Sequence, residues 1–168
     1  MTIGVVSDTH MPRFGRKLPA ALRDGFLMAG VERILHLGDF TTPQIADWFA
    51  QLAPFDAVAG NNDPPELWER FGRKKIVTCA GVRLGMIHGD GIRKTTLERA
   101  MDAFRADRVD GILFGHSHNA YCTRHGKVWV FNPGSPTDKR RNTEYSYGIL
   151  KVGPEGIVPS LHFYTARD

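Results

Sequence analysis

The amino-acid sequence predicts an α/β protein in which mixed sheets pack on each other beneath helices. Two patterns indicate this class. Short apolar strands alternate with helical segments over the first two thirds of the chain, and strands separated by Gly and Pro fill the remainder. The 168 residues, 42% of them hydrophobic, are enough to bury a sizeable core, so we expect one domain that spans residues 1–168.

Strands and helices alternate in the first part of the chain. Pro19 and Gly30 suit the first turn and the C-terminal end of one helix, and a second helix is expected to begin after Thr42. The strands of this part are predicted at residues 2–6, 34–37 and 57–59. Pro64 and Pro65 come next and predict an exposed loop instead of a regular element.

The second part of the chain is richer in strands. Ala80 and Gly81 form the turn of a predicted hairpin, and Thr95 or Thr96 can cap a helix that runs to about Ala106. The strands are predicted at residues 75–79, 82–87, 111–114, 121–123, 128–131, 145–152 and 157–163.

The composition excludes several classes of protein. A formal charge of +4, from 22 Lys+Arg and 18 Asp+Glu, favours anionic ligands slightly but is too small for a nucleic-acid-binding stripe. No apolar run approaches the length of a membrane span and the N-terminus lacks the features of a signal peptide, so we expect a cytoplasmic protein. Cys79 and Cys122 have no CxxC partner and are expected to be reduced core thiols.

Ligand-type side chains follow five of the predicted strands. They are Asp8 and His10, Asp39, Asn61, His88, and finally His116 with His118. Residues two apart in an extended chain point the same way, so each Asp-x-His or His-x-His pair can reach a common centre. One such residue after a strand is typical of an ordinary turn, but turn chemistry does not require five in a row. Ligands in such sheets bind outside the carboxyl ends of the strands.

The number and type of these side chains indicate a site for two metal ions. Two carboxylates, four imidazoles and one amide oxygen are too many ligands for one tetrahedral zinc ion and about right for two ions that share a carboxylate. Mixed nitrogen and oxygen ligands without thiolate suit Mn²⁺, Ni²⁺, Zn²⁺ or Fe, among which we expect Mn²⁺.

The ordered motifs resemble those of the calcineurin-like metallophosphoesterases. The motifs are Ser7-Asp8-Thr9-His10, Gly38-Asp39, Gly60-Asn61-Asn62-Asp63, His88-Gly89 and Gly115-His116-Ser117-His118. The short chain and the closing Asn132-Pro133-Gly134-Ser135 are most similar to the small prokaryotic phosphodiesterase branch, which also contains the eukaryotic retromer scaffold subunit. The resemblance runs from Ile3 to about Ser135 and implies a four-layer α/β/β/α sandwich, with helices outside two mixed sheets.

The same resemblance implies a role for each ligand. One metal ion would be bound by Asp8, His10 and His118, and the other by Asn61, His88 and His116. Asp39 would bridge both. The implied activity is a dinuclear-metal-dependent phosphodiesterase that hydrolyses phosphodiester bonds by in-line attack of a metal-bridging hydroxide.

One position departs from the wider family. Many relatives carry a general-acid His after the metal-binding Asn, where this chain has Asn62, which cannot donate a proton in acid catalysis. We therefore expect good leaving groups to be handled far better than alkoxides. Asp63 is expected either to orient its loop or only to cap a turn. The other three histidines, His36, His125 and His162, are expected to be structural.

Several readings of function and partners stay open. The expected substrate is a phosphodiester, either a small molecule or a nucleotide, and a homo-oligomer is compatible with the sequence. A phosphomonoesterase or nucleotidase would use the same residues, and a catalytically weak retromer-like interaction scaffold would share the fold. A mononuclear iron oxygenase would leave four of the ligands unexplained.

Two basic clusters, at residues 13–17 and 93–94, could approach a phosphate or be solvated, and the run at residues 139–141 is too short to indicate nucleic-acid binding.

Overall fold

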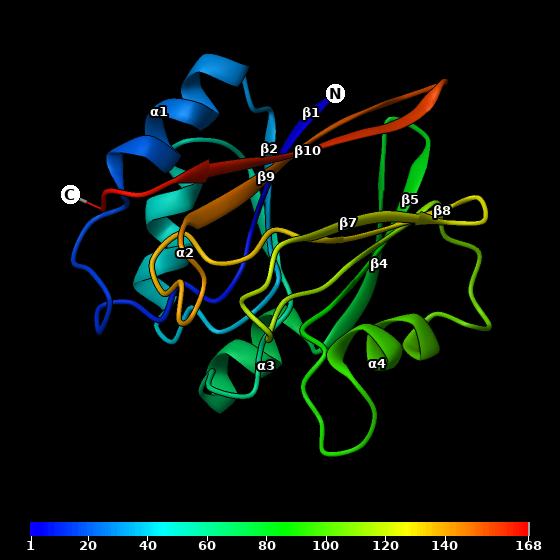
Figure 1. The fold of residues 1–168 in the computed structure, drawn as a ribbon, viewed down its shortest axis with the longest axis horizontal. Coiled ribbons are helices and arrows are strands. Elements are labelled where there is room, and N and C mark those ends of the chain that lie inside the picture. Colours follow the sequence, from blue (N-terminus) through cyan, green and yellow to red (C-terminus); the bar gives the residue numbers. More distant parts are fainter. Residues whose placement is uncertain (168) are drawn as a thin grey trace.

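Two five-stranded mixed sheets stack on each other in the structure, a computed structural model that describes residues 1–167 (Figure 1). Sheet A contains, in spatial order, β10 (Gly156–Tyr164), β9 (Tyr145–Gly153), β1 (Thr2–Val6), β2 (Arg33–His36) and β3 (Phe55–Ala57). Sheet B contains β4 (Lys74–Cys79), β5 (Val82–Ile87), β6 (Gly111–Leu113), β8 (Val128–Asn132) and β7 (Tyr121–His125).

The centre of each sheet is parallel and its edges are antiparallel. In sheet A, β1, β2 and β3 run parallel. β9 pairs with β1 in the antiparallel direction, and β10 pairs with β9 in the antiparallel direction. In sheet B, β5, β6 and β8 run parallel, flanked by the antiparallel β4 and β7. Since parallel strands end on the same edge of a sheet, the loops after β1, β2, β5 and β6 gather at one end of the sandwich.

Three apolar clusters define the layers. One lies between the sheets and includes Val5 of β1 and Leu84 of β5. The second packs α1 (Ala20–Ala29), α2 (Pro43–Ala50) and α3 (Pro65–Phe71) against the outer face of sheet A. The third packs α4 (Thr96–Ala103) on the outer face of sheet B, so the predicted four-layer α/β/β/α sandwich is confirmed (Figure 1).

The prediction of a loop at Pro64 and Pro65 is wrong, because α3 begins there. Pro64 is the N-cap with φ −71° and Pro65 is the first helical residue. The first N–H groups of a helix have no partner within the helix, so the missing N–H of Pro65 loses nothing and its fixed φ already suits the helix. A proline pair stops a preceding element without preventing a following one.

Most other boundaries agree with the sequence to within a few residues. Gly30 ends α1 in the left-handed conformation with φ +67°, as expected for a C-terminal glycine. Thr95 forms a capping box with Glu98 at the start of α4, which ends at Ala103 and not near Ala106. The third strand ends early, at Ala57, because the Ala59 N–H donates to the carbonyl of Gly72 and leaves the ladder.

Two expectations from the composition can be set beside the structure. Cys79 is buried, Cys122 is half-buried, and both are free thiols. Within residues 1–167, none of the helices has the length and apolar character needed to cross a membrane.

Candidate metal centre

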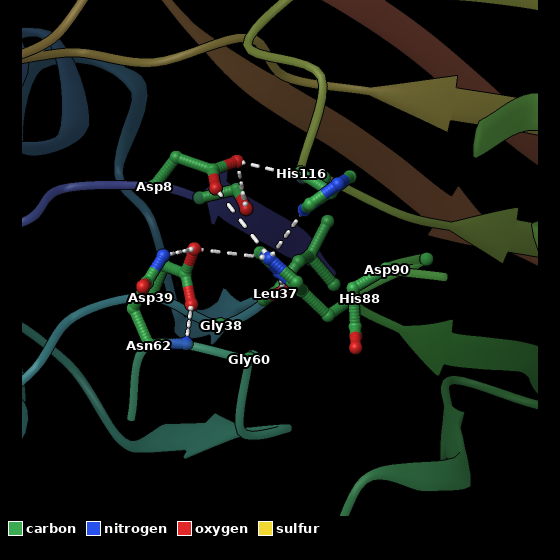
Figure 2. A network of polar contacts seen from close by, with 12 residues as sticks. Asp8, Leu37, Gly38, Asp39, Gly60, Asn62, His88, Asp90 and His116 are labelled. Carbon is green, nitrogen blue, oxygen red and sulfur yellow. Dashed lines mark hydrogen bonds and ion pairs between the residues drawn. The ribbon is translucent and has the colours of Figure 1, made fainter. Parts of the chain in front are cut away.

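Six of the seven predicted ligands come together at the end of the sandwich where the parallel strands finish. Figure 2 shows four of them, Asp8, Asp39, His88 and His116. They form two groups, and within each group the ligand atoms lie within 4.8 Å of one another. The first group is Asp8, His10 and His118, and the second group is Asp39, His88 and His116. This division agrees with the one that the family resemblance implied for the histidines and Asp8, whereas Asp39, expected to bridge both ions, is grouped with His88 and His116, and Asn61 is in neither group.

The ligand atoms of the first group have no hydrogen-bond partner within residues 1–167. Asp8 Oδ1 lies 3.8 Å from His10 Nε2 and 3.5 Å from His118 Nε2, and all three atoms are buried. A buried polar atom without a partner costs about 1–3 kcal/mol. Three such atoms that converge from separate loops fit a cation, which would coordinate all of them at once.

The second group is internally paired, and its carboxylate faces both groups. Asp39 Oδ2 lies 3.2 Å from His88 Nε2, and His116 Nδ1 lies 3.3 Å from His88 Nε2. The same Asp39 oxygen is 3.6 Å from His10 Nε2 of the first group. A carboxylate placed between the two sets of imidazoles suits the bridging role expected of Asp39.

The backbone and a hydroxyl orient the ligands from behind. His88 Nδ1 donates to the carbonyl of Leu37 at 2.7 Å, and His118 Nδ1 donates to the carbonyl of Asp138 at 2.6 Å, which turns the Nε2 atom of each ring toward the centre. Asp8 Oδ2 accepts hydrogen bonds from Ser7 Oγ and from the His116 N–H, so Oδ1 is left for a metal ion. Asp138 was not predicted, because no motif marks a residue that acts through its backbone carbonyl.

The ligands reach the centre from a strained backbone. Asp8, Asp39 and His116 have φ values of +56°, +61° and +67°, and His10 and His118 also lie in the left-handed region. Non-glycine residues rarely adopt this region, and they do so mainly where the surroundings hold them there. Asp8 and His10 meet in one group, as their spacing predicts, but His116 and His118 fall in different groups. The extended chain on which both expectations depended is wrong, because these residues are left-handed.

His36 is a structural residue behind both groups. Its Nδ1 accepts a hydrogen bond from the Gly38 N–H, so the proton is on Nε2, which donates to Thr9 Oγ1 at 3.1 Å. Burial lowers the pKa of His36 to about 3, so the ring is neutral. The expectation that His36 is a hydrogen-bonded core residue is confirmed. Thr9 lies between Asp8 and His10 of the first group, and Gly38 precedes Asp39 of the second group. One ring therefore supports the loops of both groups.

Asp63 orients the Asp39 loop. Its buried carboxylate accepts hydrogen bonds from the N–H groups of Asp39, Gly60 and Thr41 at 2.8, 2.7 and 2.6 Å. Burial raises the pKa of this carboxyl. Of the two roles considered for Asp63, the structure supports the orienting one.

The remaining two histidines lie outside both groups as the structure describes them. His125 Nε2 lies 2.8 Å from the hydroxyl of Tyr121, and the ring of His162 stacks on Tyr147 with centroids 5.1 Å apart. Both are therefore structural, as expected.

Charge at the centre is divided unevenly. Burial raises the pKa of Asp8 to about 7. Burial also acts against protonation of His88, but the carboxylates of Asp8 and Asp39 outweigh it and raise the pKa of His88 to about 9. Burial lowers the pKa of His10 and His116, and lowers that of His118 to about 4. The centre is therefore built of carboxylates and mostly neutral imidazoles, which suits a cation.

The two asparagines after β3 differ in position. Both are exposed, but no contact of Asn61 with the ligands is described, and its role as a ligand stays a prediction. Asn62 donates twice to Asp39, from its N–H to Oδ1 at 2.8 Å and from its side-chain Nδ2 to Oδ2 at 2.9 Å (Figure 2). These bonds and the neighbouring His88 outweigh the effect of burial and hold the pKa of Asp39 well below its ordinary value.

Comparisons with known proteins agree with this geometry. Residues 1–155 match the sequence profile of the calcineurin-like phosphoesterase superfamily domain. A protein of Methanothermobacter thermautotrophicus named probable metallophosphoesterase is 33% identical over 161 residues, which are 94% of this chain and 89% of that protein. Among solved structures, Vps29 of Chaetomium thermophilum has a TM-score of 0.78 at 19% identity and covers 98% of both chains. An archaeal phosphodiesterase has a TM-score of 0.74 at 23% identity, over 96% of this chain and 100% of that one.

Proposed function

Because the chain belongs to the calcineurin-like phosphoesterase superfamily, we propose that it hydrolyses phosphodiesters with two divalent metal ions. The observation that carries the proposal is the convergence of three buried, unpartnered ligand atoms in the first group beside the Asp39 carboxylate. The first group would hold one ion, and the second group, completed by Asn61, would hold the other. We propose Mn²⁺ as the native ion.

The metal ions and the residues of the chain would have different roles at this centre. When bound, two divalent ions polarise a phosphoryl oxygen and lower the pKa of water toward neutrality. The carbonyls of Leu37 and Asp138 hold the His88 and His118 rings in the required tautomer. Phosphoryl transfer depends mainly on positioning and on neutralisation of charge, so no nucleophilic side chain is needed.

A diester is favoured over a monoester by the residue at position 62. The amide of Asn62 donates to Asp39 and has no proton to give to an alkoxide leaving group. General acid catalysis typically contributes about 10²–10⁴ in rate, so the chain should depend on good leaving groups. An archaeal phosphodiesterase shares the fold, which supports the same choice.

The second candidate is a catalytically weak interaction scaffold, and the likeness to Vps29 favours it. A scaffold needs a surface but no converging ligand atoms. In this chain Asp8 Oδ1, His10 Nε2 and His118 Nε2 are buried without partners among residues 1–167, which is costly unless a cation is bound. The ligand set therefore supports metal binding, and turnover is what separates the enzyme from the scaffold, since Vps29 of Entamoeba histolytica has also been solved in complex with Zn²⁺.

A matched substrate panel tests the proposal. Purified protein is loaded with Mn²⁺, Ni²⁺ or Zn²⁺ and assayed on diesters, monoesters, and 2′,3′- and 3′,5′-cyclic nucleotides. We expect turnover of diesters that chelation abolishes and that His118→Ala removes. His125→Ala, which removes a histidine from β7 outside both groups, is the matched control and should retain activity. No turnover on any substrate, with no metal bound by mass spectrometry, would support the scaffold.

A further inference from the structure

The loop between β8 and β9 is fixed against the first group. Ser135 Oγ donates to the carbonyl of Asp8 at 2.8 Å, and Thr137 Oγ1 donates to the carbonyl of Thr9 at 2.6 Å. The carbonyl of Asp138 accepts from His118, as described above. At the far end of the loop, Asn142 Nδ2 donates to the carbonyl of His118 at 3.1 Å. The residues between these anchors are therefore held beside the first group.

Arg140 stands on this loop as an unpaired cation. Its backbone has φ +48°, and its N–H donates to Asp138 Oδ1 at 3.3 Å. Its guanidinium is exposed and makes no hydrogen bond, ion pair or ring contact with residues 1–167. Its positive charge nevertheless reaches the centre, because it helps to lower the pKa of both His10 and His118, after the larger effect of burial.

The other cations near Arg140 differ from it in their contacts or in their effect on the first group. Lys139 Nζ lies 5.0 Å from the centroid of Tyr145, and Arg167 donates to the carbonyls of Phe14 and Thr137. Arg141 is exposed and is not among the largest influences on the pKa of His10 or His118. Arg140 is thus set apart from its neighbours by being both unpaired and electrically coupled to the first group.

The other flank of the centre, next to His116, differs because the donors of its cations are already used. Arg99, which helps to lower the pKa of His116 after the larger effect of burial, donates to the carbonyls of Gly89, Arg93 and Lys94. Arg73 binds Asp90 with two hydrogen bonds of 2.7 and 2.8 Å. Lys94 pairs with Asp102, whose carboxylate also accepts from Arg105. A cation with free donors therefore lies on the side of the first group, where Arg13 also sits, with its guanidinium 5.2 Å from the ring centroid of Phe14.

A diester alone does not account for a cation with free donors at this place. Two divalent ions and the carboxylates of Asp8 and Asp39 leave a charge of about +2 at the centre, which a singly charged diester and a hydroxide ion balance. A further cation held at the rim of a balanced centre suits a further anionic group on the ligand.

We propose that Arg140 binds a second phosphate of the substrate, so that the preferred substrates are phosphodiesters that carry a further phosphate group. This inference rests on the proposed function and specifies its substrate class. One cation, not a basic stripe, occupies the site, so the ligand is of mononucleotide size and not a long nucleic acid. Arg140 acts on specificity, and the metal ligands act on the reaction.

Two inhibitors that differ only in one phosphate test the proposal. Thymidine 3′,5′-bisphosphate and thymidine 5′-monophosphate are compared as inhibitors of bis(p-nitrophenyl) phosphate turnover by the Mn²⁺-loaded protein, and their binding is measured by calorimetry. We expect the bisphosphate to bind at least about tenfold tighter, since a charge-assisted contact is worth that much. Arg140→Ala should reduce this ratio to about two, and Arg140→Lys should restore part of it.

Arg141→Ala is the matched control, since it removes the same charge from the next position of the loop. It should keep the tenfold ratio. An unchanged ratio in Arg140→Ala, or the same loss in Arg141→Ala, would overturn the proposal by showing only general electrostatic attraction. Metal content is measured in each variant by mass spectrometry. If no diester is turned over, the proposed function fails, and the calorimetric ratio still decides whether Arg140 binds a second phosphate.

Discussion

The two ligand groups have the same composition, one carboxylate and two imidazoles, but they differ in how their charge is compensated. In the second group His88 and Asp39 pair at 3.2 Å, and the pKa of His88 is raised to about 9. In the first group Asp8 Oδ1 and the two imidazole Nε2 atoms have no partner among residues 1–167. Without metal, the proton on His88 is hydrogen-bonded to Asp39, whereas it compensates Asp8 only through its charge at 3.7 Å and leaves the ligand atoms of the first group without a hydrogen bond.

This difference predicts that a metal ion stabilises the two groups in different ways. In the first group the ion would satisfy buried atoms that otherwise lower the stability of the fold. In the second group it would displace the proton of His88, so its affinity there depends on pH. Asp39 is the residue that links the two, because its Oδ2 faces His10 as well as His88.

The largest expected effect is that of Asp39→Ala. Loss of the shared carboxylate should remove the second metal ion and weaken the first, and reduce kcat/KM on bis(p-nitrophenyl) phosphate by roughly 10³-fold or more. Metal content by mass spectrometry and steady-state kinetics check both parts. Asp90→Ala is the control, because Asp90 pairs with Arg73 and does not belong to either group. Full turnover in Asp39→Ala would exclude the bridging role.

The next effect separates the two groups by stability without metal. His88→Ala leaves the buried carboxylates of Asp8 and Asp39 without their cation and should lower the free energy of unfolding by about 3–5 kcal/mol. His10→Ala removes an unpartnered atom, which relieves a cost, and also the ring contacts with Phe14 and His118, so it should change the free energy of unfolding by no more than about 1 kcal/mol. Urea unfolding of the metal-free variants measures both. Equal losses would show that the second group is not internally compensated.

The sequence predicted the ligands because their type and order carry the chemistry. Six of them meet as expected, since each follows a parallel strand and parallel strands end at one edge. The left-handed backbone at Asp8 and His118 was not predictable, because local propensity disfavours it and only the folded surroundings hold it. The loop predicted at Pro65 was wrong for a different reason. Proline suits both a loop and the first turn of a helix, and which of the two it occupies here depends on where the chain turns after β3.

Contacts made through the backbone were also out of reach of the sequence. The carbonyls of Leu37 and Asp138 orient two of the ligands, and any residue type could supply them. By contrast, Asp63 could be considered in advance, because its side chain is the part that acts. The predictable part of the site is therefore the part whose chemistry belongs to side chains.

A smaller effect concerns His36, which supports both groups and adds no charge to either. Its pKa is about 3 in the folded protein and near 6.5 in an unfolded chain, so below pH 6.5 the unfolded state binds a proton that the folded state does not. The free energy of unfolding should then fall as pH falls, by about 2 kcal/mol from this ring between pH 6.5 and 4.5.

His36→Gln should reduce that slope in the metal-free protein, as measured by urea unfolding at several pH values. Thr9→Val keeps the titrating ring and removes its hydroxyl partner, so this variant should be less stable but should keep the slope. The same pH dependence in His36→Gln and the wild type would show that other groups cause the acid sensitivity.

The smallest effect asks whether Asn62, the partner of Asp39 in the second group, limits the reaction by lacking a proton. Rates on diesters of graded leaving-group pKa should fall steeply in the wild type, because nothing at this position protonates an alkoxide. Asn62→His should raise the rate on poor leaving groups by about tenfold and make the dependence shallower. Asn62→Ala loses the same contact with Asp39 Oδ2 without supplying an acid, so it should stay as steep as the wild type. If the His and Ala variants show the same slope, the proton reaches the leaving group from elsewhere, and Asn62 serves only to hold Asp39 in place.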